Sequence, residues 1–349
     1  MLFNVDFDDG VTIAGWVAPD NPSETTRVRI VIPGRDEIEI EAGNLRQDVV
    51  DATFHSTGYV GFAIDSSVIP DIQFLDDIEV VEAKTRLSIY RRLRTGDQLE
   101  RKVMFFDSTV LQRRDAIRNI KSSFTLSYFN SERLGLETMT GILNNTTNKS
   151  VFVSGRLSYL RYRHLIESNN YLCVALLRDP LEELAERLLL LKLMARSATP
   201  DILLTFITGL DPLIEFARDL PLNDPKGLPK AFRNMDEAQR QAIISPMVRM
   251  FGCNVGELPR PADTGAALDN IASMDVVGTY SRLGTFRALL SASLGADIFG
   301  HEAPATPSTV TTLAASLARI GTVTELLAQD LAFYSYAEEA ISAAMALTP

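Results

Sequence analysis

The stretch Tyr171–Met194, YLCVALLRDPLEELAERLLLLKLM, decides the fold because it joins a strand, a turn and a helix. The apolar run Leu172–Leu177 has the length of a buried strand and stops abruptly at Arg178. Asp179 can cap the following helix, and Pro180 suits its first turn, where a backbone N–H would have no partner. The pattern predicts that Arg178 lies at the carboxyl end of a strand beside a helix N-terminus. Anionic ligands bind at that position in open α/β sheets.

Arg178 has two interpretations at such a position. Its guanidinium is a planar fork that binds a phosphate group through two parallel hydrogen bonds. Alternatively, it pairs with Asp179 or Glu182 and closes the turn between the strand and the helix. The residues alone leave both interpretations open.

Composition limits the possible functions. The chain has 349 residues and a formal net charge of -11, so we expect two domains and no binding to nucleic acid. Cys173 and Cys253 stand in apolar surroundings and are expected to be buried thiols, and no Cys/His cluster has the spacing of a metal site. The sequence shows no signal peptide and no apolar run of about 18 residues. We therefore expect a cytoplasmic protein without a membrane span.

Residues 1–95 alternate between apolar and polar side chains with the period of a β-strand. Val28–Ile32 and Ile38–Glu41 show this alternation on both sides of a Pro-Gly turn signal, so they are expected to form a hairpin. Arg46 and Asp48 are expected to form a structural pair that holds a loop. Short strands joined by regular turns predict a small β-sandwich domain in this part of the chain.

The pattern changes at about residue 96. Lys102–Asp107 reads as a short buried strand followed by a helix to about residue 124, and Val151–Gly155 reads as another short strand. The chain after Leu177 is mostly helical. Alternating strands and helices favour an α/β layer domain over residues 96–349 with a helical C-terminal part.

The order of these segments resembles the sulfotransferases, especially the heparan 2-O-sulfotransferase-like and bacterial polysaccharide branches. The matching pieces are the strand, loop and helix of 102–124, Val-Ser-Gly at 153–155, Leu-Leu-Arg-Asp-Pro at 176–180 and a helical tail up to residue 345. In that tail, 267–271, 276–280 and 286–295 together resemble one helical unit. The resemblance implies a P-loop-like, three-layer parallel sheet. Residues 1–95 resemble the small β-domain that precedes bacterial polysaccharide-modifying transferases, through Gly15–Val17, Ala42–Val49 and Gly58–Phe62.

The resemblance also implies an activity. The family transfers a sulfuryl group from 3′-phosphoadenylyl sulfate (PAPS) to a hydroxyl group, here of a surface carbohydrate or polysaccharide. Ser108 and Thr109 would contact the 5′-phosphate of this donor, and Arg178 its 3′-phosphate. Arg156 would face the sulfuryl oxygens. The resemblance leaves the base unassigned, and Asp107 is the candidate for it because it stands at the end of the first strand.

Several positions depart from the family pattern. The family has a Lys-Thr-Gly-Gly-Thr-like loop after the first strand, whereas Phe106–Leu111 contains neither lysine nor glycine. Gln112 and the two arginines after it could supply positive charge or form a solvated helix face. Arg156 replaces a histidine and cannot accept a proton. Glu186 replaces a serine eight residues after Arg178, and a carboxylate there repels a phosphate group.

These departures leave a second hypothesis open. The fold could be retained without catalysis, in a carbohydrate-associated binding or scaffold protein. Glycosyl transfer is a third class, but it would need an Asp-x-Asp metal motif. Asp8-Asp9 and Asp76-Asp77 are only adjacent acids of the kind found in turns.

Overall fold

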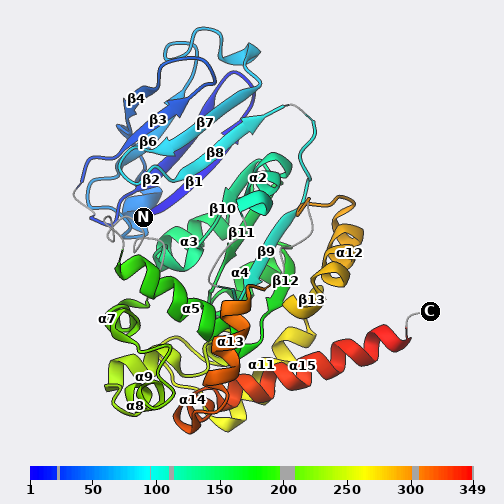
Figure 1. The fold of residues 1–349 in the computed structure, drawn as a ribbon. Coiled ribbons are helices and arrows are strands. Elements are labelled where there is room, and N and C mark those ends of the chain that lie inside the picture. Colours follow the sequence, from blue (N-terminus) through cyan, green and yellow to red (C-terminus); the bar gives the residue numbers. More distant parts are fainter. Residues whose placement is uncertain (22–23, 95, 110–113, 197–208, 301–305, 348–349) are drawn as a thin grey trace.

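The computed structural model describes the chain except for residues 22–23, 95, 110–113, 197–208, 301–305 and 348–349. The described part is a mixed α/β structure with three sheets (Figure 1). Residues 2–93 supply two four-stranded antiparallel sheets, and residues 102–279 supply a five-stranded parallel sheet. Among the described helices, none combines the length and apolar character needed to cross a membrane.

The two antiparallel sheets share one apolar core, to which both contribute alternate side chains such as Ile13, Val28, Ile30 and Phe62. The first sheet has the order β1 (Leu2–Asp8), β2 (Ile13–Ala18), β6 (Tyr59–Ile64), β5 (Asn44–Leu45). The second has the order β4 (Ile38–Glu41), β3 (Arg27–Val31), β7 (Asp77–Glu82), β8 (Ser88–Leu93). Short helices α1 (Gln47–Asp51) and η1 (Ile72–Phe74) lie in the connections. The predicted hairpin is confirmed, because β3 and β4 pair antiparallel.

The expected pair of Arg46 and Asp48 is also present. Arg46 Nε lies 2.9 Å from Asp48 Oδ1, and Arg46 Nη1 lies 2.5 Å from Asp6 Oδ2 in β1. The Arg46 guanidinium lies over the Trp16 ring of β2, 5.9 Å from its centroid. The pair therefore ties the loop before α1 to the outer face of the first antiparallel sheet.

A buried ion pair between Asp8 and Arg92 joins the two antiparallel sheets. Arg92 Nε donates to Asp8 Oδ2 at 2.7 Å, and Arg92 Nη1 donates to the Ile72 carbonyl at 2.7 Å. The Tyr90 hydroxyl and the Gly10 amide also donate to the Asp8 carboxylate, at 2.5 and 2.8 Å. Burial alone would raise the pKa of Asp8, but the donors, led by Arg92 and Tyr90, bring it below its ordinary value.

The parallel sheet has its first strand in the centre. Its order is β10 (Leu126–Tyr128), β11 (Val151–Gly155), β9 (Lys102–Asp107), β12 (Leu172–Leu177), β13 (Val276–Thr279). The three strands predicted from the sequence are therefore confirmed as β9, β11 and β12. The chain leaves β9 toward β10 and leaves β12 toward β13, so the carboxyl ends of β9 and β12 form a topological switch point.

The placement of 276–280 in a helical unit is wrong. Val276–Thr279 is the edge strand β13, which pairs parallel with β12, and only Tyr280–Arg282 forms a short 3-10 turn, η3. Four residues are too few to show the period of a strand, and β13 depends on β12 for its backbone hydrogen bonds. A Cβ atom at Gly278 would lie only 2.6 Å from the Phe286 ring, so this strand requires glycine there.

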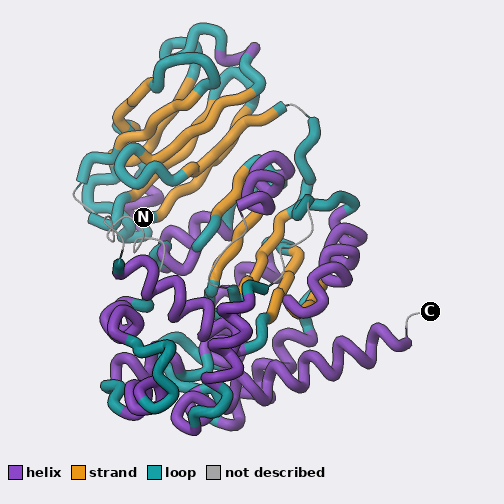
Figure 2. The backbone as a smooth tube through the Cα atoms, in the orientation of Figure 1, coloured by secondary structure: helices purple, strands orange, loops and turns teal. Residues whose placement is uncertain are grey.

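Helices cover both faces of the parallel sheet (Figures 1 and 2). On one face, α2 (Arg114–Ser123) and α12 (Leu283–Leu294) pack with Val103 and Phe105 of β9. On the other face, Met104 and Phe106 pack with α4 (Tyr159–Ser168), α10 (Pro246–Gly252), α11 (Pro261–Ala272) and α15 (Ala328–Leu347). The alternation along β9 therefore sends successive side chains at its end to opposite faces of the sheet.

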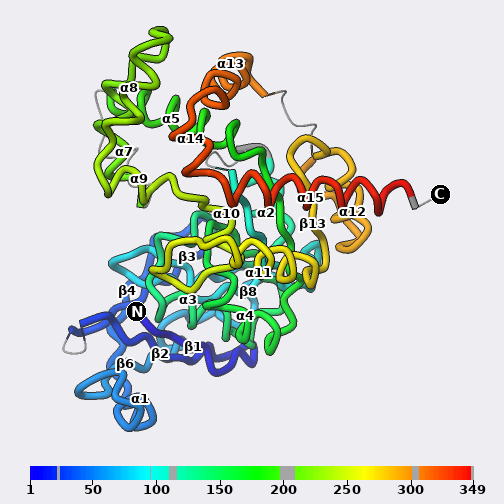
Figure 3. The backbone as a smooth tube through the Cα atoms, turned by 90° about the horizontal axis from the view of Figure 1, so that it is seen from below, coloured from blue at the N-terminus to red at the C-terminus, as the bar shows by residue number. Residues whose placement is uncertain are grey.

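The helix after β12, α5 (Pro180–Ala195), leads into a second apolar core. That core also includes α7 (Asp211–Asp219), α8 (Gly227–Arg233), α9 (Glu237–Ile243), α13 (Ser308–Leu317) and α14 (Gly321–Leu326). Figure 3 shows these helices gathered on one side of the molecule, away from the antiparallel sheets. The predicted cap is confirmed, because Asp179 Oδ1 accepts hydrogen bonds from the amides of Leu181 and Glu182 at 2.9 and 3.0 Å.

The polar loop at 144–150 joins the antiparallel sheets to the parallel sheet. The helix before it, α3 (Leu136–Leu143), packs on β1 so closely that a Cβ atom at Gly141 would lie 3.1 Å from the Phe3 ring. Three side chains from this loop and from β10 donate to backbone carbonyls of the antiparallel sheets: Thr147 to Val5 at 2.6 Å, Asn148 to Arg91 at 3.0 Å and Tyr128 to Ser88 at 2.8 Å.

We predict that Arg92→Met lowers the free energy of unfolding by about 3 kcal/mol, because it leaves Asp8 buried without its charged partner. The neighbouring Arg91 is the matched control. It pairs with Asp77 at 2.8 Å with both side chains about a quarter exposed, so Arg91→Met should cost less than about 1 kcal/mol. Urea unfolding monitored by circular dichroism measures both values. Equal losses in the two variants would contradict a structural role for the buried pair.

Candidate functional site

A pocket of about 490 Å³ lies at the carboxyl edge of the parallel sheet. It is lined by Ser108 after β9, by Arg156 after β11, by the first turn of α4, by α5 and by α10. Its volume is within the range of small-molecule sites, and its position beside the switch point is where open α/β sheets bind ligands.

Ser108 connects the ends of the two central strands. Its amide donates to the Leu176 carbonyl at 3.1 Å, and its hydroxyl oxygen accepts a hydrogen bond from the Arg178 amide at 2.9 Å. The residue is 3% exposed and lines the pocket. Ser108 therefore fixes the spacing between β9 and β12 at the edge where the pocket begins.

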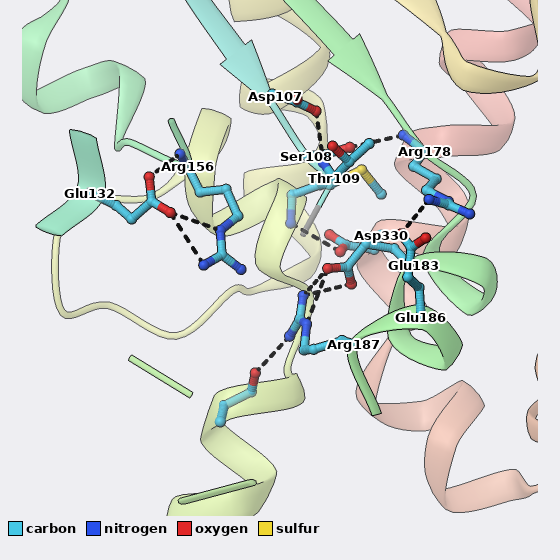
Figure 4. A network of polar contacts seen from close by, with 12 residues as sticks. Asp107, Ser108, Thr109, Glu132, Arg156, Arg178, Glu183, Glu186, Arg187 and Asp330 are labelled. Atoms are coloured by element: carbon cyan, nitrogen blue, oxygen red, sulfur yellow. Dashed lines mark hydrogen bonds and ion pairs between the residues drawn. The ribbon is translucent and has the colours of Figure 1, made fainter. Parts of the chain in front are cut away.

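The side chain of Arg178 contacts acidic and aromatic side chains of the same chain (Figure 4). It is 2% exposed, its Nη1 atom forms an ion pair with Glu186 Oε2, and its Nε atom lies 3.8 Å from Glu182 Oε2. The guanidinium also lies over the Tyr280 ring, 4.7 Å from its centroid. Burial raises the pKa of Glu186 above its ordinary value, and Arg178 opposes that shift. Of the two sequence interpretations, the structure has the one in which Arg178 pairs internally, with Glu186 as an additional partner.

Arg156 also has an internal partner, Glu132 in the short 3-10 turn η2 (Ser131–Arg133). The Arg156 amide donates to Glu132 Oε2 at 3.1 Å, and Arg156 Nη2 lies 3.3 Å from Glu132 Oε1. Gly155 makes this approach possible, because a Cβ atom there would lie 2.5 Å from Glu132 Oε2. The pair lines the pocket with a guanidinium and a carboxylate in fixed orientation.

Asp107 and Thr109 lie on the opposite face of the sheet from the pocket. They line a separate apolar pocket of about 40 Å³ near Phe105 and Phe152, which is too small for a nucleotide. Asp107 Oδ1 accepts a hydrogen bond from the Thr109 amide at 2.9 Å, and burial raises the pKa of Asp107 to about 6. Gln112 and Arg113, the other expected sources of donor contacts, lie outside the described residues.

The five residues expected from the sequence are thus divided between different surroundings. Ser108 and Arg156 line the large pocket, and Asp107 and Thr109 line the small one. Arg178 lines neither of these two pockets. Figure 4 shows Arg156 and Arg178 on opposite sides of Ser108.

Sequence reasoning assigned only Arg156 among the charged residues that line the large pocket, and the buried residues that it missed include Glu183, Arg187 and Asp330. Arg187 Nη2 forms an ion pair with Glu183 Oε1 at 2.6 Å, and both side chains are buried. Their spacing of four residues in α5 was visible in the sequence, but their burial was not. Asp330 accepts hydrogen bonds at 3.0 and 2.8 Å from the first two amides after Pro246 in α10, and burial raises its pKa to about 7. No sequence pattern near Asp330 indicates that its side chain caps the N-terminus of α10.

The charged and apolar side chains that line the large pocket can contact a polar organic ligand. Among the residues that the structure describes, no three His, Cys, Asp or Glu side chains are grouped to hold a metal ion. Comparison with known proteins gives no further lead, since no protein-family model, no curated protein and no solved structure matches the chain.

We predict that Asp107→Asn changes the dependence of stability on pH. Because burial raises the pKa of Asp107 to about 6 in the folded state, the wild type loses stability as the pH rises from about 4 through 6. The neutral amide in the variant does not titrate, so relative to wild type Asp107→Asn should gain about 2 kcal/mol between pH 4.5 and pH 8.

Urea unfolding of both proteins at the two pH values measures this difference. A difference between the two proteins that stays constant with pH would show that Asp107 has an ordinary pKa in the folded state.

Proposed function

We propose that this chain is a carbohydrate-associated binding protein, built on a P-loop-like fold related to the sulfotransferases, whose donor site is closed. The observation that carries the proposal is the internal pairing of Arg178. This residue is the one donor-site position at which the sequence keeps the pattern of the sulfotransferases, and its guanidinium is already bound to Glu186.

The relationship to the sulfotransferases is supported by the arrangement of the sheet. The first strand, β9, is central, helices cover both faces, and the loop after β9 begins at the switch point. An Arg-Asp-Pro turn follows β12, next to that loop. These backbone features suit a phosphate site in an ancestor of this protein. The side chains that stand there in this chain close that site to a phosphate group.

The ion pair of Arg178 with Glu186 works against binding of PAPS. A 3′-phosphate would have to displace Glu186, and the displaced carboxylate would lose its cation in a site where its side chain is 13% exposed. Breaking a buried pair in this way costs about 3 kcal/mol, which corresponds to a loss of more than a hundredfold in affinity. The repulsion between the phosphate and Glu186 adds to that loss.

The open pocket suits a saccharide better than a nucleotide. It combines apolar side chains such as Leu157 and Met250 with the fixed pairs Arg156–Glu132 and Arg187–Glu183. Planar guanidinium and carboxylate groups in fixed orientation offer paired donors and acceptors to neighbouring hydroxyl groups, and the apolar side chains can cover the C–H face of a sugar ring.

We predict that adenosine 3′,5′-bisphosphate, the nucleotide product of sulfuryl transfer, does not raise the melting temperature of the wild type at 1 mM. Glu186→Gln tests the cause. This variant keeps a hydrogen-bond acceptor for Arg178 but removes the negative charge. The nucleotide should therefore raise the melting temperature of Glu186→Gln more than that of the wild type. Differential scanning fluorimetry provides the measurement, and Glu167→Gln, an exposed acid on α4, is the control.

A rise of several degrees in the wild type that disappears in Arg178→Ala would overturn the proposal and favour an active sulfotransferase. Carbohydrate binding is tested separately by retardation in native gels that contain bacterial polysaccharides. Retardation should decrease in Arg156→Gln, which faces the pocket, and should be unchanged in Arg163→Gln, which is exposed on α4 and does not line it.

A further inference from the structure

We propose that the large pocket contains an anion subsite at the N-terminus of α4, which takes the carboxylate or phosphate group of a bound saccharide. This inference rests on the proposed function, because it specifies the chemical class of the ligand in the same pocket. Three observations support it: an uncapped helix start, two arginines without acidic partners, and acids in the pocket that are already engaged.

The N-terminus of α4 faces the pocket without a side-chain cap. Ser158 is the N-cap residue, yet its side chain makes no capping hydrogen bond. Its hydroxyl oxygen is buried and has no hydrogen-bond partner in the described part of the protein, and the residue lines the pocket. The first amides of a helix have no partner within the helix and carry partial positive charge, so they attract an anion at this position.

Arg161 and Arg249 add full positive charge at the same place. Arg161 lies in the first turn of α4 and Arg249 in α10, these two helices pack against each other, and both residues line the pocket. Neither arginine forms an ion pair with an acid among the described residues. The one polar contact of Arg249 in that part of the chain is from Nη1 to the Gln241 carbonyl, at 2.8 Å. Two such guanidiniums in a chain of net charge -11 point to an anionic ligand.

Each acid that lines the pocket has another partner, and none of them forms an ion pair with Arg161 or Arg249 in the described part of the chain. Glu132 pairs with Arg156 and Glu183 pairs with Arg187, while Asp330 accepts the amides at the start of α10. The fourth acid, Glu257, accepts hydrogen bonds from the amide and the side chain of Asn254, at 3.3 and 3.2 Å. Arg161 and Arg249 are therefore the two lining arginines without a carboxylate partner among the described residues.

The test is isothermal titration of the full chain at low salt with glucose, glucuronate, glucose 6-phosphate and inorganic phosphate. The two charged sugars distinguish a carboxylate from a phosphate as the preferred anion. We expect at least one of them to bind ten times more tightly than glucose, a difference of about 1.4 kcal/mol. That advantage should shrink as the salt concentration rises.

The variants Arg161→Gln and Arg249→Gln should each remove most of the advantage of the charged sugar and leave glucose binding unchanged. Arg163→Gln is the matched control, because Arg163 lies on the same helix, pairs with Glu167 at 2.7 Å and does not line the pocket. Ser158→Ala is a second variant that removes no hydrogen bond of the described structure. It should keep its melting temperature while it weakens binding of the charged sugar.

The outcomes separate this inference from the proposed function. Equal affinities for glucose and both charged sugars would overturn the anion subsite and leave saccharide binding intact. Binding of inorganic phosphate that depends on Arg161, without binding of any sugar, would support the subsite and count against the proposed function. If none of the four compounds gives a heat of binding, both the anion subsite and the proposed function are overturned.

Discussion

The ion pair between the buried guanidinium of Arg178 and Glu186 is the interaction on which the carboxyl edge of the parallel sheet depends. Burial in a medium of low dielectric is costly for an unpaired charge, so a buried arginine is stable only beside an acid or a bound anion. Glu186 fills that role one helical turn beyond Glu182 on α5, and the Tyr280 ring covers the guanidinium. The charge of Arg178 at the edge beside β12 is therefore met by acids of the chain itself, although its Nε atom is buried without a hydrogen-bond partner in the described part of the protein.

This neutralisation divides the carboxyl edge into two regions with different properties. On the side of β12, Arg178 is buried and paired with Glu182 and Glu186 of α5. On the side of β11, the chain leaves a pocket between α4, α5 and α10 in which charged groups remain accessible to a ligand. Ser108 stands at the boundary and holds the two central strands together through backbone contacts. The two regions therefore differ in whether their charged groups can contact a ligand.

Local patterns were sufficient to predict the parts of the fold that depend on local physics. The strands β9, β11 and β12 each contain a short apolar run, and the Asp179 cap involves residues only two and three positions away. Interactions between residues that are distant in sequence could not be predicted from such local patterns. Glu132 lies 24 residues from Arg156, and Asp330 lies more than 80 residues from the amides that it caps. The strand β13 was mistaken for part of a helical unit because its four residues carry too little pattern.

The same limit applies to the candidate site. The resemblance to the sulfotransferases placed five residues in one site, and chain order does not tell to which face of a sheet each side chain points. Asp107 and Ser108 are adjacent in sequence and face opposite sides, as the alternation of a strand requires. A one-residue difference in position is enough to move a side chain from one pocket to the other.

The joint between the antiparallel sheets and the parallel sheet has a consequence for how the sequence can vary. Thr147, Asn148 and Tyr128 supply the donors on one side, and backbone carbonyls supply every acceptor on the other. Every residue type has a backbone carbonyl, so substitutions at the acceptor positions in β1 and β8 keep these hydrogen bonds. Substitutions at the three donors remove them. Tolerance to mutation across this joint is therefore unequal, and the antiparallel sheets can diverge in sequence without losing their attachment.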